Sequence, residues 1–225
     1  MLINDEWQTD TPTFPVFNPA TGEEIGQVAD GTDKDAARAI DAASAALPAW
    51  MSETAYARSA VLYRAYHLML EQQRELAELM TREQGKPLKA SMNEVKYAAD
   101  FLLWFAEEAK RVYGETIPSA RSDQRFLVQK QAVGVVAAVT PWNYPISMLT
   151  RKLGPALAAG CTVVLKPAES TPLCAIAVFK LLEEAGLPPG VANLVTASDP
   201  KPIGEVFCTH PAVRKLTLRG RTPAR

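Results

Sequence analysis

Val135-Val-Ala-Ala-Val139 is a short, uninterrupted run of β-prone apolar residues, and the fold prediction starts from it. A strand buried on both faces of a parallel sheet has this composition, without the alternation of a half-exposed strand. Cys161-Thr-Val-Val-Leu165 repeats the pattern, and Val191–Val195 and Lys215–Leu218 follow as a third and a fourth strand. Because helical stretches separate these runs, we expect a parallel α/β sheet with right-handed connections.

A small β-ribbon is predicted near the N-terminus. The turn-forming stretch Asn18-Pro-Ala-Thr-Gly22 lies between two short β-prone pieces, Val16-Phe17 and Ile25-Gly-Gln-Val28. This order is typical of a hairpin. A second extended segment is expected over residues 116–132, where Phe126 and Val128 alternate with polar neighbours.

Three helices are predicted between the N-terminal ribbon and the sheet. Thr32-Asp-Lys-Asp35 has the form of a capping box and opens the first, which we expect to stop at Pro48. The second is expected from about Glu53 to Gln84, where Gly85 closes it, and the third from about Leu88 to Tyr113. Apolar residues at helical spacing support both.

The composition is that of a soluble globular protein: 48% of the 225 residues are hydrophobic and 22% are charged. A formal net charge of −1 gives no electrostatic reason to expect a nucleic acid or a membrane as partner. The N-terminus has no signal-peptide pattern, and the longest apolar run is too short to span a bilayer. Three cysteines, an odd number without metal-ligand spacing, argue against a disulfide framework and for a reducing compartment. We expect the cytoplasm.

The loop Thr140-Pro-Trp-Asn-Tyr-Pro145 follows the first parallel strand, at the edge where open α/β sheets bind ligands. Trp142 could form the wall of a site for an apolar ring. The amide of Asn143 could stabilise negative charge that develops on a carbonyl oxygen. The alternative is a rigid structural turn in which Asn143 bonds to nearby backbone. On chemistry alone both interpretations remain open.

Lys166-Pro-Ala-Glu169 follows the second strand, just ahead of a helix that Thr171-Pro172 is expected to open, with Thr171 at the N-cap. Lys166 could donate to a phosphate, and Glu169 could accept from sugar hydroxyls. A surface loop with two solvated charges is the more common case. The fingerprint GxGxxG is absent, so any dinucleotide must bind without the usual glycine-rich turn.

A few other side chains could carry chemistry. Arg151, about two helical turns after the Asn143 loop, suits the binding of a carboxylate, although a solvated helix face is the commoner explanation. Cys161 and Cys174 lie in apolar surroundings and are interpreted as core residues. Neither histidine has a ligand partner in a recognisable spacing, and we expect no metal site.

Taken together, these segments resemble the NAD(P)-dependent aldehyde dehydrogenase superfamily over nearly the whole chain, with succinate-semialdehyde dehydrogenases as the most similar members. Each segment alone is modest evidence for the family, but the order and spacing of the segments are specific to it. The resemblance favours the functional interpretation of both loops. It is carried by Phe17-Asn-Pro-Ala-Thr-Gly22, Pro141-Trp-Asn-Tyr-Pro145, Met148-Leu-Thr-Arg-Lys152, Gly154-Pro-Ala-Leu-Ala-Ala-Gly160, Val164-Leu-Lys-Pro-Ala-Glu169, Gly186-Leu-Pro-Pro-Gly190 and His210-Pro-Ala-Val-Arg-Lys-Leu216.

The resemblance implies oxidation of an aldehyde, succinate semialdehyde being favoured, to its acid with NAD or NADP. Asn143 would be the oxyanion-hole amide, and Arg151 would meet the distal carboxylate of the substrate. Lys166 and Glu169 would hold the adenine ribose, and the acidic Glu169 gives NAD a mild preference. The cofactor would contact two stretches: Thr140, Pro141, Trp142 and Asn143, and Lys166, Pro167, Ala168 and Glu169.

The resemblance also divides the chain. Residues 1–115 would form the N-terminal ribbon and the helical part of the cofactor-binding domain, and residues 116–132 an extended ribbon resembling the oligomerisation segment. Residues 133–225 would form the parallel α/β part: a Rossmann-like sheet that is incomplete, with no catalytic domain. The family is homo-oligomeric, and whether this chain assembles is left open.

The family mechanism needs a cysteine nucleophile and a glutamate base, both downstream of residue 225, and none of the three cysteines matches the nucleophile's motif. Leu218-Arg-Gly-Arg221 also departs from the family turn that should carry the cofactor's pyrophosphate. This Arg-rich end suggests a truncated or frameshifted reading frame. The alternative function is therefore a non-catalytic remnant that binds nucleotide weakly or associates with intact subunits.

Overall fold

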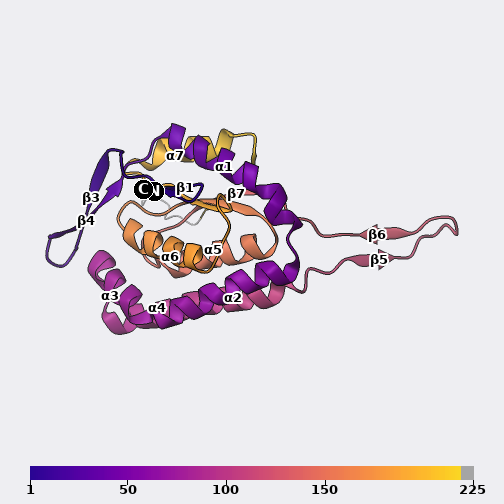
Figure 1. Ribbon diagram of the computed structural model, residues 1–225, viewed down its shortest axis with the longest axis horizontal. Helices are drawn as coiled ribbons and strands as arrows, with labels where there is room; N and C mark the ends of the chain where they lie inside the picture. The colour runs from indigo at the N-terminus through magenta and orange to yellow at the C-terminus, as the bar shows by residue number, and fades with distance from the viewer. Residues whose placement is uncertain (219–225) are drawn as a thin grey trace, which may run out of the picture.

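The computed structural model describes residues 1–218 as a six-stranded sheet with helices on both faces and a long two-stranded arm at one end (Figure 1). The strands follow the order β10-β7-β8-β9-β1-β2. The predicted α/β class is confirmed, and so are the four parallel strands, β7 (Val135–Val139), β8 (Thr162–Lys166), β9 (Ala192–Leu194) and β10 (Val213–Leu218). The predicted pyrophosphate turn lies, from Arg219 on, outside the described residues.

The sheet is mixed because β1 (Leu2–Ile3) pairs antiparallel with β9 and with β2 (Glu6–Trp7). Sequence patterns did not predict this addition, since two residues are too few to show a strand period. The side chains of Leu2 and Ile3 are nevertheless buried, so their packing holds the N-terminus in the sheet. The predicted hairpin is confirmed as β3 (Thr13–Phe17) and β4 (Glu24–Ala29).

The predicted helices are present with shifted ends. α1 (Asp33–Ser52) runs past Pro48, because the buried Trp50 anchors the turn after the proline, so the predicted stop is wrong. The capping contact that opens α1 is present, with the Thr32 N–H 2.9 Å from Asp35 Oδ2. The predicted second helix is divided at Gln72, whose backbone leaves the helical region. The other helices are α2 (Ala55–Glu71), α3 (Gln73–Gln84), α4 (Leu88–Ala109), α5 (Ser147–Ala158), α6 (Pro172–Glu184) and α7 (Pro200–Thr209).

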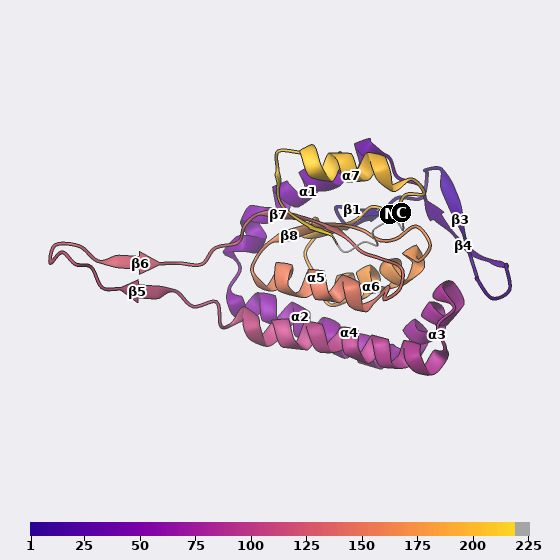
Figure 2. The same cartoon turned by 180° about the vertical axis from the view of Figure 1, so that it is seen from behind.

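The helices form layers on the two faces of the sheet (Figures 1 and 2). α1 and α7 cover one face, and α5 and α6 cover the other. α2 and α4 lie outside α5 as a further layer, and α3 continues that layer beside α6. No helix among residues 1–218 is both long and apolar enough to cross a membrane.

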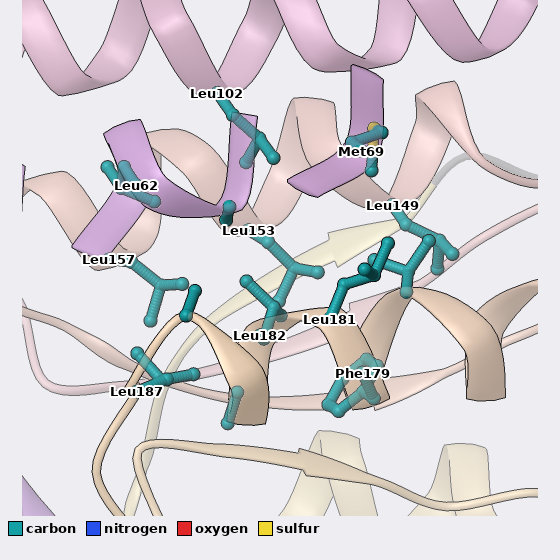
Figure 3. Close-up of a cluster of buried hydrophobic side chains, with 14 of the residues drawn as sticks. Leu62, Met69, Leu102, Leu149, Leu153, Leu157, Phe179, Leu181, Leu182 and Leu187 are labelled. Atoms are coloured by element: carbon teal, nitrogen blue, oxygen red, sulfur yellow. The ribbon is translucent and has the colours of Figure 1, made fainter. Parts of the chain in front are cut away.

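The larger core lies between the α5–α6 layer and the outer helices (Figure 3). Leu62 and Met69 of α2, with Leu102 of α4, point toward the leucines of α5 and α6. Gly154 lets α4 and α5 approach closely, because a Cβ there would lie 3.0 Å from Phe105 Cδ2. This packing places α4 beside the start of α5 and therefore beside the loop that follows β7.

The arm is built from β5 (Glu115–Ile117) and β6 (Phe126–Val128), which pair antiparallel and extend away from the body (Figure 2). The segment 116–132, predicted as extended, holds most of both strands, and a turn joins them at residues 120–123. The apolar side chains of the arm are exposed, most of all that of Leu127. Nothing in the body of the protein covers them within residues 1–218.

Leu153→Ala should lower the free energy of unfolding by about 2–5 kcal/mol, because Leu153 is fully buried and the change leaves a cavity. Urea unfolding of the purified chain measures this value. The matched control is Leu127→Ala on the exposed arm, which should stay within about 0.5 kcal/mol of the original chain. Equal effects of the two substitutions would contradict the described core.

Candidate functional site

Two loops lie together at the carboxyl edge of the parallel strands. One starts at Thr140, directly after β7, and the other follows Lys166, the last residue of β8. The Thr140 N–H donates to the Lys166 carbonyl oxygen at 3.1 Å, and both residues are buried. Because parallel strands end at the same edge, the two predicted site loops are neighbours in space.

The second loop holds a buried cation beside an exposed carboxylate. The Lys166 side chain is only 3% exposed, and its Nζ donates to the Pro167 carbonyl oxygen at 2.9 Å and to Glu169 Oε2 at 3.4 Å. Burial lowers the pKa of Lys166, although the negative charges of Glu169 and Asp199 oppose this effect. The Glu169 carboxylate is 51% exposed, so it remains available to accept hydrogen bonds from a ligand.

The first loop borders a cleft of about 660 Å³. Asn143 and Arg151 both line it, so the structure brings together the two residues that the family resemblance implies for the substrate. The Arg151 guanidinium lies over the Phe101 ring, 5.5 Å from its centroid. Trp142 is half-exposed, and it is not among the described residues that line this cleft. The other lining residues are Lys86, Ala90, Asn93, Glu94, Tyr97, Tyr144 and Met148.

Buried glutamates occupy the N-termini of α5 and α6. Glu94 Oε1 accepts from the backbone N–H groups of Ile146 at 3.1 Å and Ser147 at 3.2 Å. Glu83 accepts from the N–H groups of Leu173 and Cys174 at the start of α6. A helix N-terminus attracts anions, and in this protein the side chains of Glu94 and Glu83 take that place.

The predicted start of α6, with Thr171 at the N-cap and Pro172 in the first helical position, is confirmed, but another residue supplies the capping bonds. Thr171 stands at the N-cap position and Pro172 is the first helical residue, but the Thr171 side chain makes no capping bond. Glu83, which is distant in sequence, satisfies the first free N–H groups of α6 instead. A carboxylate that accepts two N–H groups leaves no need for a hydroxyl cap.

Glu83 and Glu94 were not singled out as functional residues in the sequence. A signal existed, because Glu94 lies at helical spacing with the buried residues Ser91, Val95 and Ala98 of α4. A charged residue on the apolar face of a helix indicates a buried polar partner. The sequence does not show which partner, because the donating N–H groups are more than 50 positions away.

The three cysteines lie outside the cleft. Cys161 and Cys174 are buried, and Cys208 is exposed on α7, on the other face of the sheet from α5. Burial raises the pKa of the Cys174 thiol, and the nearby Glu83 carboxylate raises it further, so Cys174 is a poor nucleophile. Within residues 1–218, no group of His, Cys, Asp and Glu side chains could hold a metal ion.

Comparison with known proteins identifies relatives over nearly the whole chain. The aldehyde dehydrogenase family model matches residues 7–225. The glutarate-semialdehyde dehydrogenase of Pseudomonas putida is 53% identical over 222 residues, which cover 98% of this chain and 46% of the relative. The succinate-semialdehyde dehydrogenase [NADP(+)] of Escherichia coli is 50% identical over 223 residues, with the same coverage. The chain thus spans less than half the length of these relatives.

Solved structures have the same fold. The crystal structure of an E. coli NADP-dependent enzyme superposes with a TM-score of 0.93 at 51% identity, over 96% of this chain and 45% of that one. A point mutant of betaine aldehyde dehydrogenase from Staphylococcus aureus, solved in complex with NAD⁺, gives a TM-score of 0.92 at 37% identity, over 96% of this chain and 44% of that one. The fold described above is therefore that of the N-terminal part of these chains.

The stability of the chain should depend on pH through Glu83, because burial raises its pKa from an ordinary 4.5 to about 7. Between these values the folded state holds a proton that the unfolded chain has released. The free energy of unfolding should therefore fall as the pH rises from 4.5 to 7, by at most about 1.4 kcal/mol per pH unit. Urea unfolding at pH 5, 6 and 7 should show a flatter profile for Glu83→Gln. Glu78→Gln, an exposed change on the same helix, should keep the pH dependence of the original chain. Parallel profiles for all three proteins would show that Glu83 does not cause this pH dependence.

Proposed function

The chain belongs to the aldehyde dehydrogenase family, and from this premise we propose that it forms the cofactor-binding part of an enzyme that oxidises a carboxylate-bearing aldehyde to its acid with NAD or NADP. Succinate semialdehyde is the favoured substrate. The observation that carries the proposal is the cleft in which Asn143 and Arg151 face the same space, beside the Lys166–Glu169 loop. Relatives named for two different semialdehydes support the substrate class.

Each residue of the cleft has a distinct task in this proposal. The Asn143 amide donates to the aldehyde oxygen as negative charge develops on it during nucleophilic attack. Arg151 binds the distal carboxylate by two charge-assisted hydrogen bonds, and this contact fixes the orientation of the aldehyde relative to Asn143. The nicotinamide cofactor supplies a hydride acceptor when bound. We assign Trp142 to the wall of its ring site and Thr140 and Pro141 to the adjoining backbone.

The Lys166–Glu169 loop fits the ribose of the adenosine half. Glu169 presents an exposed carboxylate that can accept from two adjacent hydroxyl groups, and the buried Pro167 and Ala168 give the loop a fixed backbone. A 2′-phosphate would meet the negative charge of Glu169 first, since Lys166 is 3% exposed and already bonded. We propose a mild preference for NAD on this basis, although the E. coli relative is named for NADP(+).

The pyrophosphate must bind elsewhere than at the N-termini of α5 and α6. Glu94 and Glu83 already occupy those positions, and the N–H groups that would bind a phosphate already donate to them. The predicted pyrophosphate turn after β10 lies outside the described residues. The described residues therefore fit the adenine ribose and the nicotinamide end of the dinucleotide. We assign its central pyrophosphate to that turn.

A second candidate function is a non-catalytic protein that binds nucleotide weakly or associates with complete subunits. The observation that favours it is the position of the cysteines, none of which lies in the cleft. The arm supports association, because exposed Phe126, Leu127 and Val128 form an apolar surface that a second subunit could cover. We propose homo-oligomers for the family activity and a cytoplasmic location, consistent with three free cysteines.

NAD should stabilise the chain against thermal unfolding if the Lys166–Glu169 loop binds ribose. At 100 times its dissociation constant, NAD would add about 2.7 kcal/mol to the free energy of unfolding. Glu169→Gln should reduce the shift with NAD and increase the shift with NADP, because it removes the charge that repels a 2′-phosphate. Glu205→Gln, an exposed change on α7, is the matched control and should leave both shifts unchanged. A midpoint unmoved by either cofactor would refute the cofactor assignment.

Formation of NADH from succinate semialdehyde separates the two candidate functions. Under the first, in the complete enzyme that also carries the family's cysteine and glutamate, Arg151→Gln should raise KM for succinate semialdehyde by about 10- to 100-fold, the cost of about 1.5–3 kcal/mol for lost hydrogen bonds to a charged group. The KM for butanal, which has the same length and no carboxylate, should not change. Stabilisation by NAD without any turnover would favour the non-catalytic alternative, and an equal rise for both aldehydes would exclude the carboxylate role of Arg151.

A further inference from the structure

We propose that Lys86 and Glu94 are positioning residues that hold the Asn143 loop in place for the reaction. Both belong to the stretch from the end of α3 into α4, and neither is in the loop itself. They contact the loop in its middle, at the Asn143 carbonyl, and where it ends, at the first N–H groups of α5. The inference rests on the proposed role of Asn143 and adds the residues that fix its geometry.

Glu94 fixes the end of the loop. Its side chain is 1% exposed, and one carboxylate oxygen accepts from the N–H groups of Ile146 and Ser147. These groups have no partner within α5, because Ile146 is its N-cap residue and Ser147 its first helical residue. Their hydrogen bonds to a buried carboxylate fix the residue at which the loop ends and α5 starts.

Lys86 fixes the middle of the loop. Its ammonium group pairs with the other oxygen of Glu94 and donates to the Asn143 carbonyl oxygen at 2.9 Å. It also lies over the Tyr144 ring, 4.2 Å from the centroid. One ammonium therefore contacts two successive residues of the loop and the carboxylate that caps the next helix.

These contacts limit the positions that the Asn143 side chain can take. The Asn143 carbonyl belongs to the peptide plane next to the Asn143 Cα, so its hydrogen bond limits rotation of the backbone that carries the amide. An oxyanion donor must point to where charge develops before the reaction starts, and a misplacement of about 1 Å can cost about 100-fold in rate. The Lys86 side chain is 13% exposed, so water competes little for its bonds.

Nuclear magnetic resonance relaxation of the ¹⁵N-labelled 225-residue chain tests this inference, with no cofactor or substrate added. In the original chain the backbone order parameters of Asn143 and Tyr144 should lie near the rigid value of about 0.85. Lys86→Met keeps the length of the side chain and removes its charge, and it should lower both values below about 0.6. Lys86→Arg should restore them, because a guanidinium can reach both Glu94 and the carbonyl.

Two further variants separate a local effect from general loss of stability. Glu94→Ala should speed the hydrogen exchange of the Ile146 and Ser147 amides at least tenfold. Glu83→Gln is the matched control, since Glu83 caps α6 in the same manner but does not touch the loop, and it should leave Asn143 rigid.

An Asn143 that stays rigid in Lys86→Met, or that loosens equally in Glu83→Gln, would overturn the inference. Because no ligand is present, these outcomes are independent of whether NAD binds. A failure of the proposed function would appear only in the cofactor and turnover measurements.

Discussion

The arrangement of the site depends on two buried carboxylates that neutralise two helix N-termini. Glu83 at the end of α3 and Glu94 on α4 accept from the first N–H groups of α6 and α5. The ends of α3 and α4 are tied to each other, with Thr81 Oγ1 3.0 Å from Ser91 Oγ. One helical hairpin thus sets where both helices begin, and each helix is preceded by one of the two site loops.

The two carboxylates are compensated differently. Glu94 pairs with the Lys86 ammonium, whereas no cation pairs with Glu83 among residues 1–218. A buried charge without a counterion is costly, and helix N–H groups offset only part of that cost. This difference explains why burial raises the pKa of Glu83 to about 7. The α6 end of the hairpin is therefore sensitive to pH near neutrality, while an ion pair supports the α5 end.

Much of the fold could be predicted because the decisive signals are local. The apolar run at Val135–Val139 and the turn at Asn18–Gly22 each identify an element without knowledge of the rest of the chain. The antiparallel β1 could not be predicted, since its two residues are placed by contact with Leu194 of β9, far away in sequence. The same limit applies at Pro48, where the burial of Trp50 overrides a local helix stop.

The two loops of the candidate site could be predicted from the sequence, but the residues that hold the loops in place could not. Asn143, Arg151, Lys166 and Glu169 lie at strand ends or one helix away, where topology alone brings them to one edge. Lys86 and Glu94 act on the loop from 50 to 60 positions away, through contacts that no motif spacing encodes. Resemblance to a family predicts which residues meet the ligand, and only the three-dimensional structure shows what holds those residues.

A crystal structure of the chain with bound NAD would test most directly whether the protein's own carboxylates occupy these helix N-termini during cofactor binding. We expect Glu94 still bonded to Ile146 and Ser147, Glu83 still bonded to Leu173 and Cys174, and the ribose against Glu169. The phosphates should lie away from both helix ends. A pyrophosphate bound at the N-terminus of α5 or α6, with the glutamate displaced, would contradict this description.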